Sequence, residues 1–269
     1  ADVLVNVVSA DEIAVALHAA KNAGAPVTII GNGSNLLVRD GGIRGLVLRI
    51  SGGLNAIRRE GDCLLVQAGA SLAAVAAFAR DEGLSGMAEL GGIPGTVGGG
   101  VLMNAGAYGA ELAQLVTQAE GVSLSDGRRV VYPADRLDFA YRHSALMDAG
   151  VVITQATLAL TPGDPEAIRA RMEECAKARR EKQPLTLPSA GSTFKRPEGH
   201  FAARLIDDCG LRGLTVGGAQ VSEKHAGFIV NIGGATARNM LELMRQVEQR
   251  VFEQTGVQLE PEVRILGED

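Results

Sequence analysis

A glycine-dense stretch in the middle of the chain constrains the fold more than any other feature of the sequence. Residues 91–100 read GGIPGTVGGG, and NAGAYG follows at residues 104–109. Glycine loses more backbone entropy on folding than other residues, so such density needs a structural reason. Two reasons are open: tightly packed strands that cross here, or a flat or phosphorylated ligand that lies against the main chain. The stretch lacks the GKS or GKT of a P-loop, and we favour ligand binding.

A second, shorter glycine loop, GNGSN at residues 31–35, directly follows an apolar run that reads as a strand. Glycine permits close backbone approach, and successive N–H groups in such a loop form a concave site for an anion such as a phosphate. The loop is not a Rossmann fingerprint, because the third glycine is missing and the residues after it read as a strand. A plain hairpin turn explains the loop equally well.

Charge and composition disfavour several classes of function. The formal net charge is −5, and aromatic residues make up 3% of a chain without tryptophan, whereas nucleic-acid binding needs clustered Lys and Arg or stacking rings. The three cysteines are far apart and the four histidines show no metal-binding spacing, so we expect no disulfide framework and no metal. The start carries no signal-peptide pattern and no apolar stretch reaches spanning length, so we expect a cytoplasmic protein without membrane contact. The oligomeric state is left open.

Apolar periodicity and capping residues predict a mixed α+β chain. A helix is expected after Ser9, with Glu12 completing a capping box, a second after Ser71, and a long one from Thr236 to Gly256. Further helices are expected over 165–182 and 202–209, and strands over 3–8, 27–30, 36–38, 46–48, 64–67, 116–124, 151–160, 228–232 and 263–265. These elements suggest three parts, at residues 1–50, 51–165 and 166–269.

Three polar clusters carry candidate chemistry. Arg142 in YRHS offers a planar fork for a carboxylate, although a lone exposed arginine is more often an ordinary ion pair. Ser192 in AGSTFK lies outside any GxSxG elbow, so a hydrolase nucleophile is disfavoured and a turn is the simpler interpretation. Glu260 and Glu262 flank Pro261, and strand alternation would put both on one side, with solvated charge as the default.

Taken together, these segments closely resemble the UDP-N-acetylenolpyruvoylglucosamine reductase family. The matching stretches cover nearly the whole chain in the family order: GNGSNLLVRDGGIRGLV, GGIPGTVGGGVLMNAGAYG, YRHS, PSAGSTFKRP, GGAQVSEKHAGFIVN and LEPEVRILG. The resemblance implies a vanillyl-alcohol-oxidase-type FAD-binding fold. Two small α+β domains would form FAD-binding subdomains at residues 1–50 and 51–165. A C-terminal substrate domain at 166–269 would send its final strand back to the active site.

The chain is similar to the shorter subtype of this family, which lacks an inserted tyrosine-bearing loop. Two departures from the family pattern stand out. A Thr-x-x-Arg-x-Gly-Gly segment usually precedes the first strand, and this sequence begins at Ala1 where that segment would end, so part of the FAD site is expected to lie outside it. Gly100 stands where a small apolar residue is usual, and Arg196 stands where Asn is common.

The implied reaction is a reduction in peptidoglycan precursor synthesis, a step of cell-wall formation. NADPH would reduce non-covalently bound FAD, and the reduced flavin would pass a hydride to the enolpyruvyl ether of UDP-N-acetylglucosamine-enolpyruvate, giving UDP-N-acetylmuramate. The resemblance assigns Ser192 as the proton donor, and Arg142 and Glu262 as the groups that stabilise the enolate. Glu262 would help most in its protonated form, because an ionised carboxylate would repel the enolate.

The resemblance also assigns the binding residues. The FAD phosphates are expected at the first glycine loop, and the isoalloxazine ring near the second. The expected cofactor-binding residues are Gly31, Asn32, Gly33, Ser34, Asn35, Leu36, Gly92, Ile93, Pro94, Gly95, Thr96, Gly98, Gly99, Asn104, Gly106 and Ala107. Tyr141, Lys195 and His225 are expected to bind the UDP-sugar, the last two at its phosphates.

Two other functions are compatible with parts of this pattern. The first is another FAD-dependent oxidoreductase of the same fold, such as a sugar or alcohol oxidase. An oxidase needs a base and oxygen access, which Ser192, Arg142 and Glu262 together do not suggest. The second is a non-catalytic module that binds flavin or a nucleotide sugar, which would hold flavin without turnover.

Overall fold

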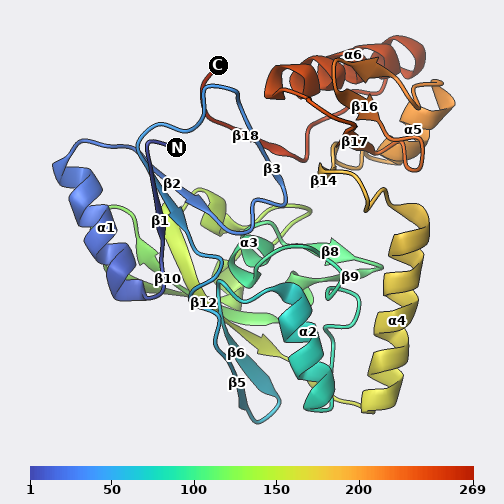
Figure 1. Ribbon diagram of the computed structural model, residues 1–269. Coiled ribbons are helices and arrows are strands. Elements are labelled where there is room, and N and C mark those ends of the chain that lie inside the picture. The colour runs from blue at the N-terminus through green and yellow to red at the C-terminus, as the bar shows by residue number, and fades with distance from the viewer. The chain divides into compact units, whose positions relative to one another are not determined.

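The computed structural model describes residues 1–269 and divides them into two compact units (Figure 1). Unit 1 contains residues 1–32 and 44–177, and unit 2 contains residues 33–43 and 178–269. Each unit therefore includes two separate pieces of the chain. The domain boundaries expected at residues 50 and 165 divide the chain differently and stay predictions.

A small parallel sheet opens unit 1. Its strands, in the order in which they pair, are β1 (Val3–Asn6), β4 (Leu46–Arg49) and β2 (Val27–Ile30), and α1 (Ala10–Asn22) connects β1 to β2. The hydroxyl of Ser9 caps α1 by accepting the N–H of Glu12, as predicted. The expected capping box is not complete, because the Glu12 carboxylate accepts the N–H of Val8 instead of that of Ser9. The Glu12 side chain therefore bonds to the residue before the N-cap and not to the N-cap itself.

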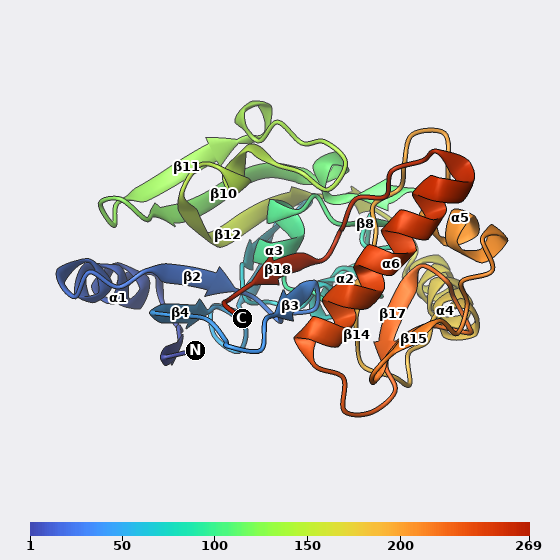
Figure 2. The ribbon, with the colours of Figure 1, turned by 90° about the horizontal axis from the view of Figure 1, so that it is seen from above.

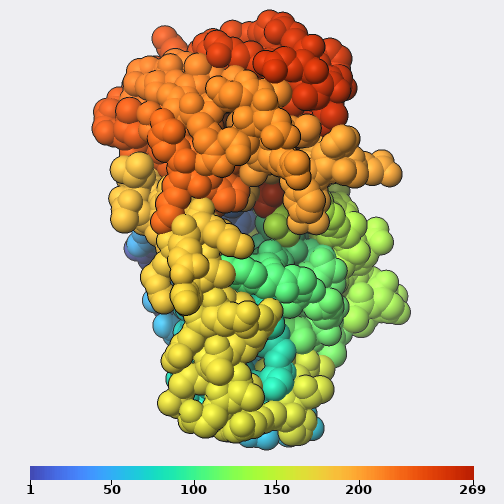
Figure 3. Space-filling model, turned by 90° about the vertical axis from the view of Figure 1, so that its right-hand side faces the viewer, coloured from blue at the N-terminus to red at the C-terminus, as the bar shows by residue number.

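A five-stranded antiparallel sheet forms the larger part of unit 1, and Figure 2 shows β11, β10 and β12 side by side. Helix α2 begins at the predicted cap Ser71 and buries its apolar stripe. Helix α4 has many charged residues, which favour a position at the surface, and it forms the yellow ridge in Figure 3. The sheet order is β11 (Arg129–Pro133), β10 (Val116–Ser123), β12 (Val151–Ala159), β6 (Cys63–Gln67) and β5 (Ile57–Glu60); the helices are α2 (Leu72–Asp81) and α4 (Pro165–Lys182), whose last residues belong to unit 2.

Short elements complete unit 1 around the glycine-dense stretch. They are β7 (Leu84–Ser85), β13 (Thr161–Pro162), β8 (Gly106–Ala107), β9 (Ala110–Glu111), and the 3-10 turns Leu112–Gln114, Ala134–Arg136 and Ala145–Met147. The stretch itself contains a short helix, α3 (Val97–Leu102), that the sequence did not predict. Glycine is a poor helix former, so packing rather than propensity holds α3: Val97 and Val101 are fully buried in the core of unit 1.

Unit 2 is built on a four-stranded antiparallel sheet covered by a long helix. The strand order is β14 (Ser189–Ser192), β17 (Phe228–Asn231), β16 (Ala219–Val221) and β15 (Thr215–Val216), and the helices are α5 (Ala202–Asp208) and α6 (Ala237–Thr255). Thr236 caps α6 and Gly256 ends it with φ 73°, both as predicted. Leu243, Met244 and Val247 bury the predicted stripe of α6.

The segment 33–43 joins this C-terminal unit although it lies near the start of the chain. Its strand β3 (Leu36–Val38) pairs in parallel with β18 (Arg264–Leu266). Beyond β3, the carboxylate of Asp40 accepts the N–H groups of Ala237 (2.7 Å) and Arg238 (3.1 Å) at the start of α6. We call residues 33–43 the strap. Sequence patterns predicted its strand, but not its partner.

Candidate active site

Ser192 and Glu262 lie on two neighbouring segments of unit 2 that are hydrogen-bonded to each other. The N–H of Glu262 donates to the carbonyl of Thr193 (2.8 Å), and the N–H of Lys195 donates to the carbonyl of Glu260 (2.8 Å). Thr193 and Val263 are buried, whereas Ser192 is exposed and Glu262 is partly buried. The two candidate side chains thus stand on paired segments, and neither of them is fully buried.

The surroundings of Ser192 suit a group that has to meet a ligand. Its side chain is exposed and its hydroxyl makes no hydrogen bond within the protein. The next residue differs completely, since Thr193 is buried and its hydroxyl oxygen accepts the N–H of Ile229 (3.0 Å). The adjacent strand β17 thereby fixes the backbone on which Ser192 stands.

The strap adds a third segment to this arrangement. The side-chain amide of Asn35 donates to the main-chain carbonyl of Glu262 (3.1 Å), and the N–H of Arg264 donates to the carbonyl of Asn35 (3.0 Å). A Cβ built on Gly191 would lie 3.8 Å from the carbonyl oxygen of Ser34. Ser34 and Asn35 of the first glycine loop, the serine segment and the glutamate segment therefore meet within unit 2.

Main-chain donors in the first glycine loop are available to an anion. The N–H groups of Gly33, Ser34 and Asn35 donate to no acceptor in unit 2. Gly33 has φ 71°, and no heavy atom lies within 4 Å of the position its Cβ would take. Successive free N–H groups of this kind suit a phosphate, so the donor set fits the phosphates of FAD.

Unit 1 contains a second group of closely packed glycines. A Cβ on Gly31 would lie 2.6 Å from the Oγ1 of Thr96, and one on Gly98 would lie 2.9 Å from the Cβ of Ala68. The close backbone crossing that the sequence left open is therefore present. It does not use every donor, because the N–H groups of Gly92 and Thr96 donate to no protein acceptor. The stretch thus provides tight packing and free donors side by side, which also fits a flat cofactor.

Arg142 occupies the tip of a tight turn in unit 1. Ala140 and His143 exchange two backbone hydrogen bonds of 3.1 Å each, and Arg142 between them has φ 55°. This left-handed conformation is costly for a residue with a side chain. The Arg142 guanidinium lies over the ring of Tyr141, 4.9 Å from its centroid. The turn therefore presents the two residues together.

Two buried side chains fasten this turn to the glycine-dense stretch. The amide of Asn104 donates to the carbonyl of Ala140 (3.1 Å), and the hydroxyl of Ser144 donates to the carbonyl of Leu102 (2.8 Å). The Asn104 oxygen also accepts the N–H of Ala113 (2.9 Å). With both ends of its side chain bonded inside the fold, Asn104 can meet FAD through its backbone only. Its assignment as a cofactor residue stays a prediction in that restricted sense.

The residues expected at the UDP phosphates have partners within unit 2. The Lys195 ammonium lies 3.2 Å from the Glu260 carboxylate. Burial lowers the pKa of His225 from its ordinary value of 6.5, and its Nδ1 accepts the N–H of Gly227 (3.2 Å). A neutral His225 can offer a phosphate an Nε2–H donor but no charge. Both assignments stay predictions, as does that of Tyr141.

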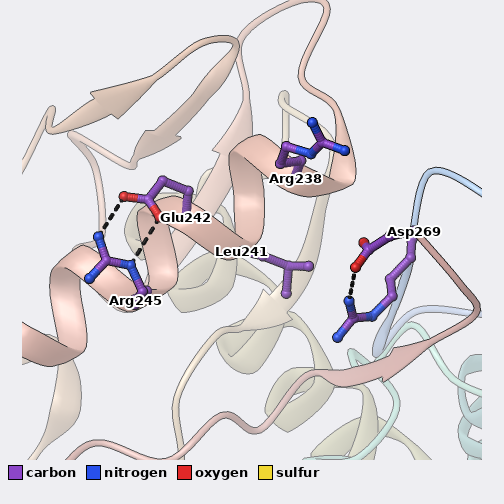
Figure 4. Close-up of a pocket in the computed structure, with 6 residues that line it drawn as sticks. Arg238, Leu241, Glu242, Arg245 and Asp269 are labelled. Atoms are coloured by element: carbon purple, nitrogen blue, oxygen red, sulfur yellow. Dashed lines mark hydrogen bonds and ion pairs between the residues drawn. The ribbon is translucent and has the colours of Figure 1, made fainter.

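Two cavities of unit 2 have linings that include neither Lys195 nor His225. One, of about 280 Å³, is lined by Arg39, Arg238 and Arg245 among others; Figure 4 shows Glu242 turned to Arg245, while Asp269 pairs with Arg39. The other, of about 390 Å³, lies between the strap and α6.

No group of three metal-ligating side chains occurs in the structure. None of its helices has the length and apolar character that crossing a membrane needs.

Sequence reasoning named Ser192, Arg142 and Glu262 as candidates, and these stay predictions; it did not name the residues whose hydrogen bonds hold their segments. Asn35 was assigned to the cofactor, and nothing local indicated that its side chain bonds to residue 262, 227 positions away. Likewise Asn104 stands 36 positions from its partner Ala140. Such contacts depend on tertiary structure. The only signal in the sequence is the residue type, an asparagine close to glycines.

Comparison with known proteins gives a consistent answer over the whole chain. Residues 1–132 match the family model described as "FAD binding domain", and residues 183–266 match "UDP-N-acetylenolpyruvoylglucosamine reductase, C-terminal domain". The reductase of that name from Pediococcus pentosaceus is 48% identical over 269 residues, with 100% of this chain and 89% of the relative covered. The one from Agathobacter rectalis is 50% identical over 264 residues, with 94% and 84% covered.

A solved structure agrees with these relatives. The UDP-N-acetylenolpyruvylglucosamine reductase (MurB) of Thermus caldophilus superimposes with a TM-score of 0.84 at 39% identity, covering 98% of this chain and 91% of that one. The FAD-binding fold predicted from the sequence, with a C-terminal domain particular to the reductases, is thereby confirmed. The chain belongs to the UDP-N-acetylenolpyruvoylglucosamine reductase family.

Proposed function

We propose that the chain is an FAD-dependent enzyme that uses NADPH to reduce UDP-N-acetylglucosamine-enolpyruvate to UDP-N-acetylmuramate in peptidoglycan precursor synthesis. The observation that carries this proposal is the pairing of the Ser192 and Glu262 segments, in which neither of the two side chains is fully buried. A proton donor and a charge-stabilising group have to reach the same substrate atoms, and this pairing suits that requirement. The cytoplasm is the location we propose, as the sequence suggested.

FAD would be held by main-chain groups of the two glycine loops. Bound FAD supplies the hydride that is added to the substrate alkene. The free N–H groups of Gly33, Ser34 and Asn35 suit its phosphates. The free N–H groups of Gly92 and Thr96 support a place for its ring system beside the second loop. We propose the remaining expected residues of both loops, from Leu36 to Ala107, as the walls of the same site.

The substrate chemistry asks for charge stabilisation followed by proton transfer. Hydride addition to the terminal carbon of the enolpyruvyl group leaves negative charge on the adjacent carbon and its carboxylate. Arg142 would meet this charge with its planar fork, and Glu262 with a hydrogen bond, which is the largest contribution in many such reactions. The Ser192 hydroxyl would then give its proton to the carbon that bears the carboxylate. Serine is a weak acid, but a carbanion-like centre is a strong base and the geometry is fixed.

Binding of the UDP moiety is proposed for Lys195 and His225, with Tyr141 at the sugar. Lys195 would exchange its exposed partner Glu260 for a phosphate, a change that costs little because exposed ion pairs contribute little. His225 would donate from Nε2, since its Nδ1 is occupied. These three assignments rest on the family resemblance together with this donor chemistry.

One anaerobic experiment tests the function and its two alternatives. The purified protein should be yellow and release FAD on heating or acid treatment. NADPH should bleach it, and UDP-N-acetylglucosamine-enolpyruvate should restore the colour much faster than air does. Rapid restoration by air would indicate an oxidase of the same fold. Colour that NADPH leaves unchanged would indicate a binding module, and either result would overturn the proposed reaction.

A further inference from the structure

The side chain of Asn35 joins the loop that we assign to the cofactor phosphates to the residue that we assign to the enolate. The side-chain amide donates to the main-chain carbonyl of Glu262 (3.1 Å), while the main-chain carbonyl of Asn35 accepts the N–H of Arg264 (3.0 Å). These two hydrogen bonds enclose Glu262 and Val263 between them. The glutamate therefore cannot shift along its segment unless the strap moves too.

We propose that Asn35 is a positioning residue that acts through Glu262, so that ordering of the glycine loop by an anion also orders the catalytic carboxyl group. This inference rests on the proposed function. The loop N–H groups of Gly33, Ser34 and Asn35 face no protein acceptor, so they are free for a phosphate. The same residue thus offers its main-chain N–H to the anion and its side chain to the glutamate segment.

The orientation of the Asn35 amide follows from its partner. A carbonyl accepts and never donates, so the nitrogen of the amide and not its oxygen has to face Glu262. Aspartate at this position would place an acceptor against an acceptor at nearly unchanged size. Asn35→Asp is therefore a sharper change than truncation, and Asn35→Ala is a second variant that removes the donor without adding charge.

Gln258 provides a matched control. Its side-chain amide donates to the main-chain carbonyl of Leu259 (3.2 Å) on the same C-terminal segment. That contact joins neighbours in sequence and does not reach the strap. Gln258→Glu makes the same chemical change as Asn35→Asp, four positions before Glu262, and should leave both half-reactions at wild-type rate.

The kinetic test is a double-mutant cycle of Asn35→Asp with Glu262→Gln, at saturating FAD. Asn35→Asp alone should slow reoxidation by the enolpyruvyl sugar about 10²-fold, the effect of misplacing a catalytic group by about 1 Å. Reduction by NADPH should stay near the wild-type rate. If Asn35 acts through Glu262, the same change in the Glu262→Gln background should cost little more, because effects within one functional unit do not multiply. Fully multiplicative losses would overturn the positioning role.

A structural test needs neither turnover nor bound flavin. In the cofactor-free protein, hydrogen exchange at the N–H groups of Glu262 and Arg264 should be faster in Asn35→Asp and Asn35→Ala than in the wild type and in Gln258→Glu. Adding FAD should slow this exchange in the wild type and much less in the variants. Unchanged exchange in both Asn35 variants would sink the inference even if activity fell. A wild-type protein that is bleached by NADPH but not reoxidised by the substrate would instead count against the proposed function.

Discussion

Asn104 and Ala140 are joined by a hydrogen bond of 3.1 Å that fastens the Arg142 turn to the glycine-dense stretch. Asn104 is itself buried although Ala140 is exposed, and the other end of the amide is bonded to Ala113. An arginine at the tip of a short turn would otherwise sample many positions. By bonding to Ala140, Asn104 holds one end of this turn and so fixes the backbone that carries Arg142.

We predict that Asn104→Ala weakens both the fold and the reaction. Losing the bonds to the carbonyl of Ala140 and the N–H of Ala113 should cost about 0.5–1.5 kcal/mol of unfolding free energy for each bond, because Ala140 is exposed and Ala113 only partly buried. Reoxidation of the flavin by substrate should slow more than its reduction by NADPH, because Arg142 serves only the former. Urea unfolding and stopped-flow absorbance measure the two effects. Asn6→Ala, an exposed asparagine that bonds to Arg49, is the control and should change neither.

Ser192→Ala should separate the two half-reactions. NADPH should still bleach the flavin at nearly the wild-type rate, since that step needs no proton from Ser192. Reoxidation by the enolpyruvyl sugar should fall steeply, because positioned proton donation contributes about 10²–10⁴-fold. Anaerobic stopped-flow decides the matter: equal slowing of both steps, or of neither, would remove Ser192 as the proton donor. Ser192→Cys should recover part of the rate.

Arg142→Lys and Glu262→Gln should impair substrate reduction more than flavin reduction. Lysine keeps the charge but loses the planar fork, and glutamine keeps the shape but loses the titratable proton. Each change should cost about 3–4 kcal/mol in the barrier, on the scale of losing one oxyanion donor. Single-turnover rates with the enolpyruvyl sugar test this, and wild-type rates in both variants would refute the two roles.

Gly31→Ala should lower FAD affinity and stability together. The new methyl group would stand 2.6 Å from the hydroxyl of the buried Thr96, so either the end of β2 or the start of α3 has to move. Gly52→Ala provides a comparison, because its Cβ meets no atom within 4 Å but its φ of 90° remains strained. Fluorescence titration with FAD should show a larger dissociation constant, and so weaker binding, for Gly31→Ala only. Similar affinities in both variants would show that the close approach to Thr96 is not required.

The strap should be most sensitive to acid at Asp40. Backbone hydrogen bonds from Ala237 and Arg238 lower the pKa of Asp40 below its ordinary value of 3.8. The stabilisation from this carboxylate is therefore fully present above pH 3.8 and is lost as the pH falls through the lowered pKa. Asp40→Asn should reduce the melting temperature at pH 7, and its difference from the wild type should shrink as the pH drops below 3.8. A difference that stays constant from pH 7 to pH 3 would contradict this origin.

Local signals in the sequence were reliable at several helix ends. Ser71 and Thr236 begin their helices and Gly256 ends one, because caps act on N–H and C=O groups a few residues away. Helix α3 escaped notice because three glycines oppose it and only the packing of Val97 and Val101 supports it. Propensity alone cannot reveal a helix that tertiary contacts impose.

Candidate site residues could be named from the sequence and stay predictions, whereas the hydrogen bonds that hold their segments could not be predicted. Ser192, Arg142 and Glu262 stand in short motifs that could be compared with a family. The bonds of Asn35 and Asn104 join positions that no motif connects. The capping box at Ser9 failed for a related reason, since a one-residue change of partner, from Ser9 to Val8, depends on how the chain enters α1.

Because it includes the strap, unit 2 combines two parts of the chain that are far apart in sequence. During translation residues 33–43 are made long before Arg264–Leu266, so β3 cannot pair with β18 until that strand has been synthesised. A fragment that starts at residue 178 would leave the edge of β18 open and the first N–H groups of α6 without the Asp40 carboxylate. Unit 2 therefore cannot be cut out as one continuous piece, and a circular permutant that joins the strap to the C-terminal segment would be the natural way to isolate it.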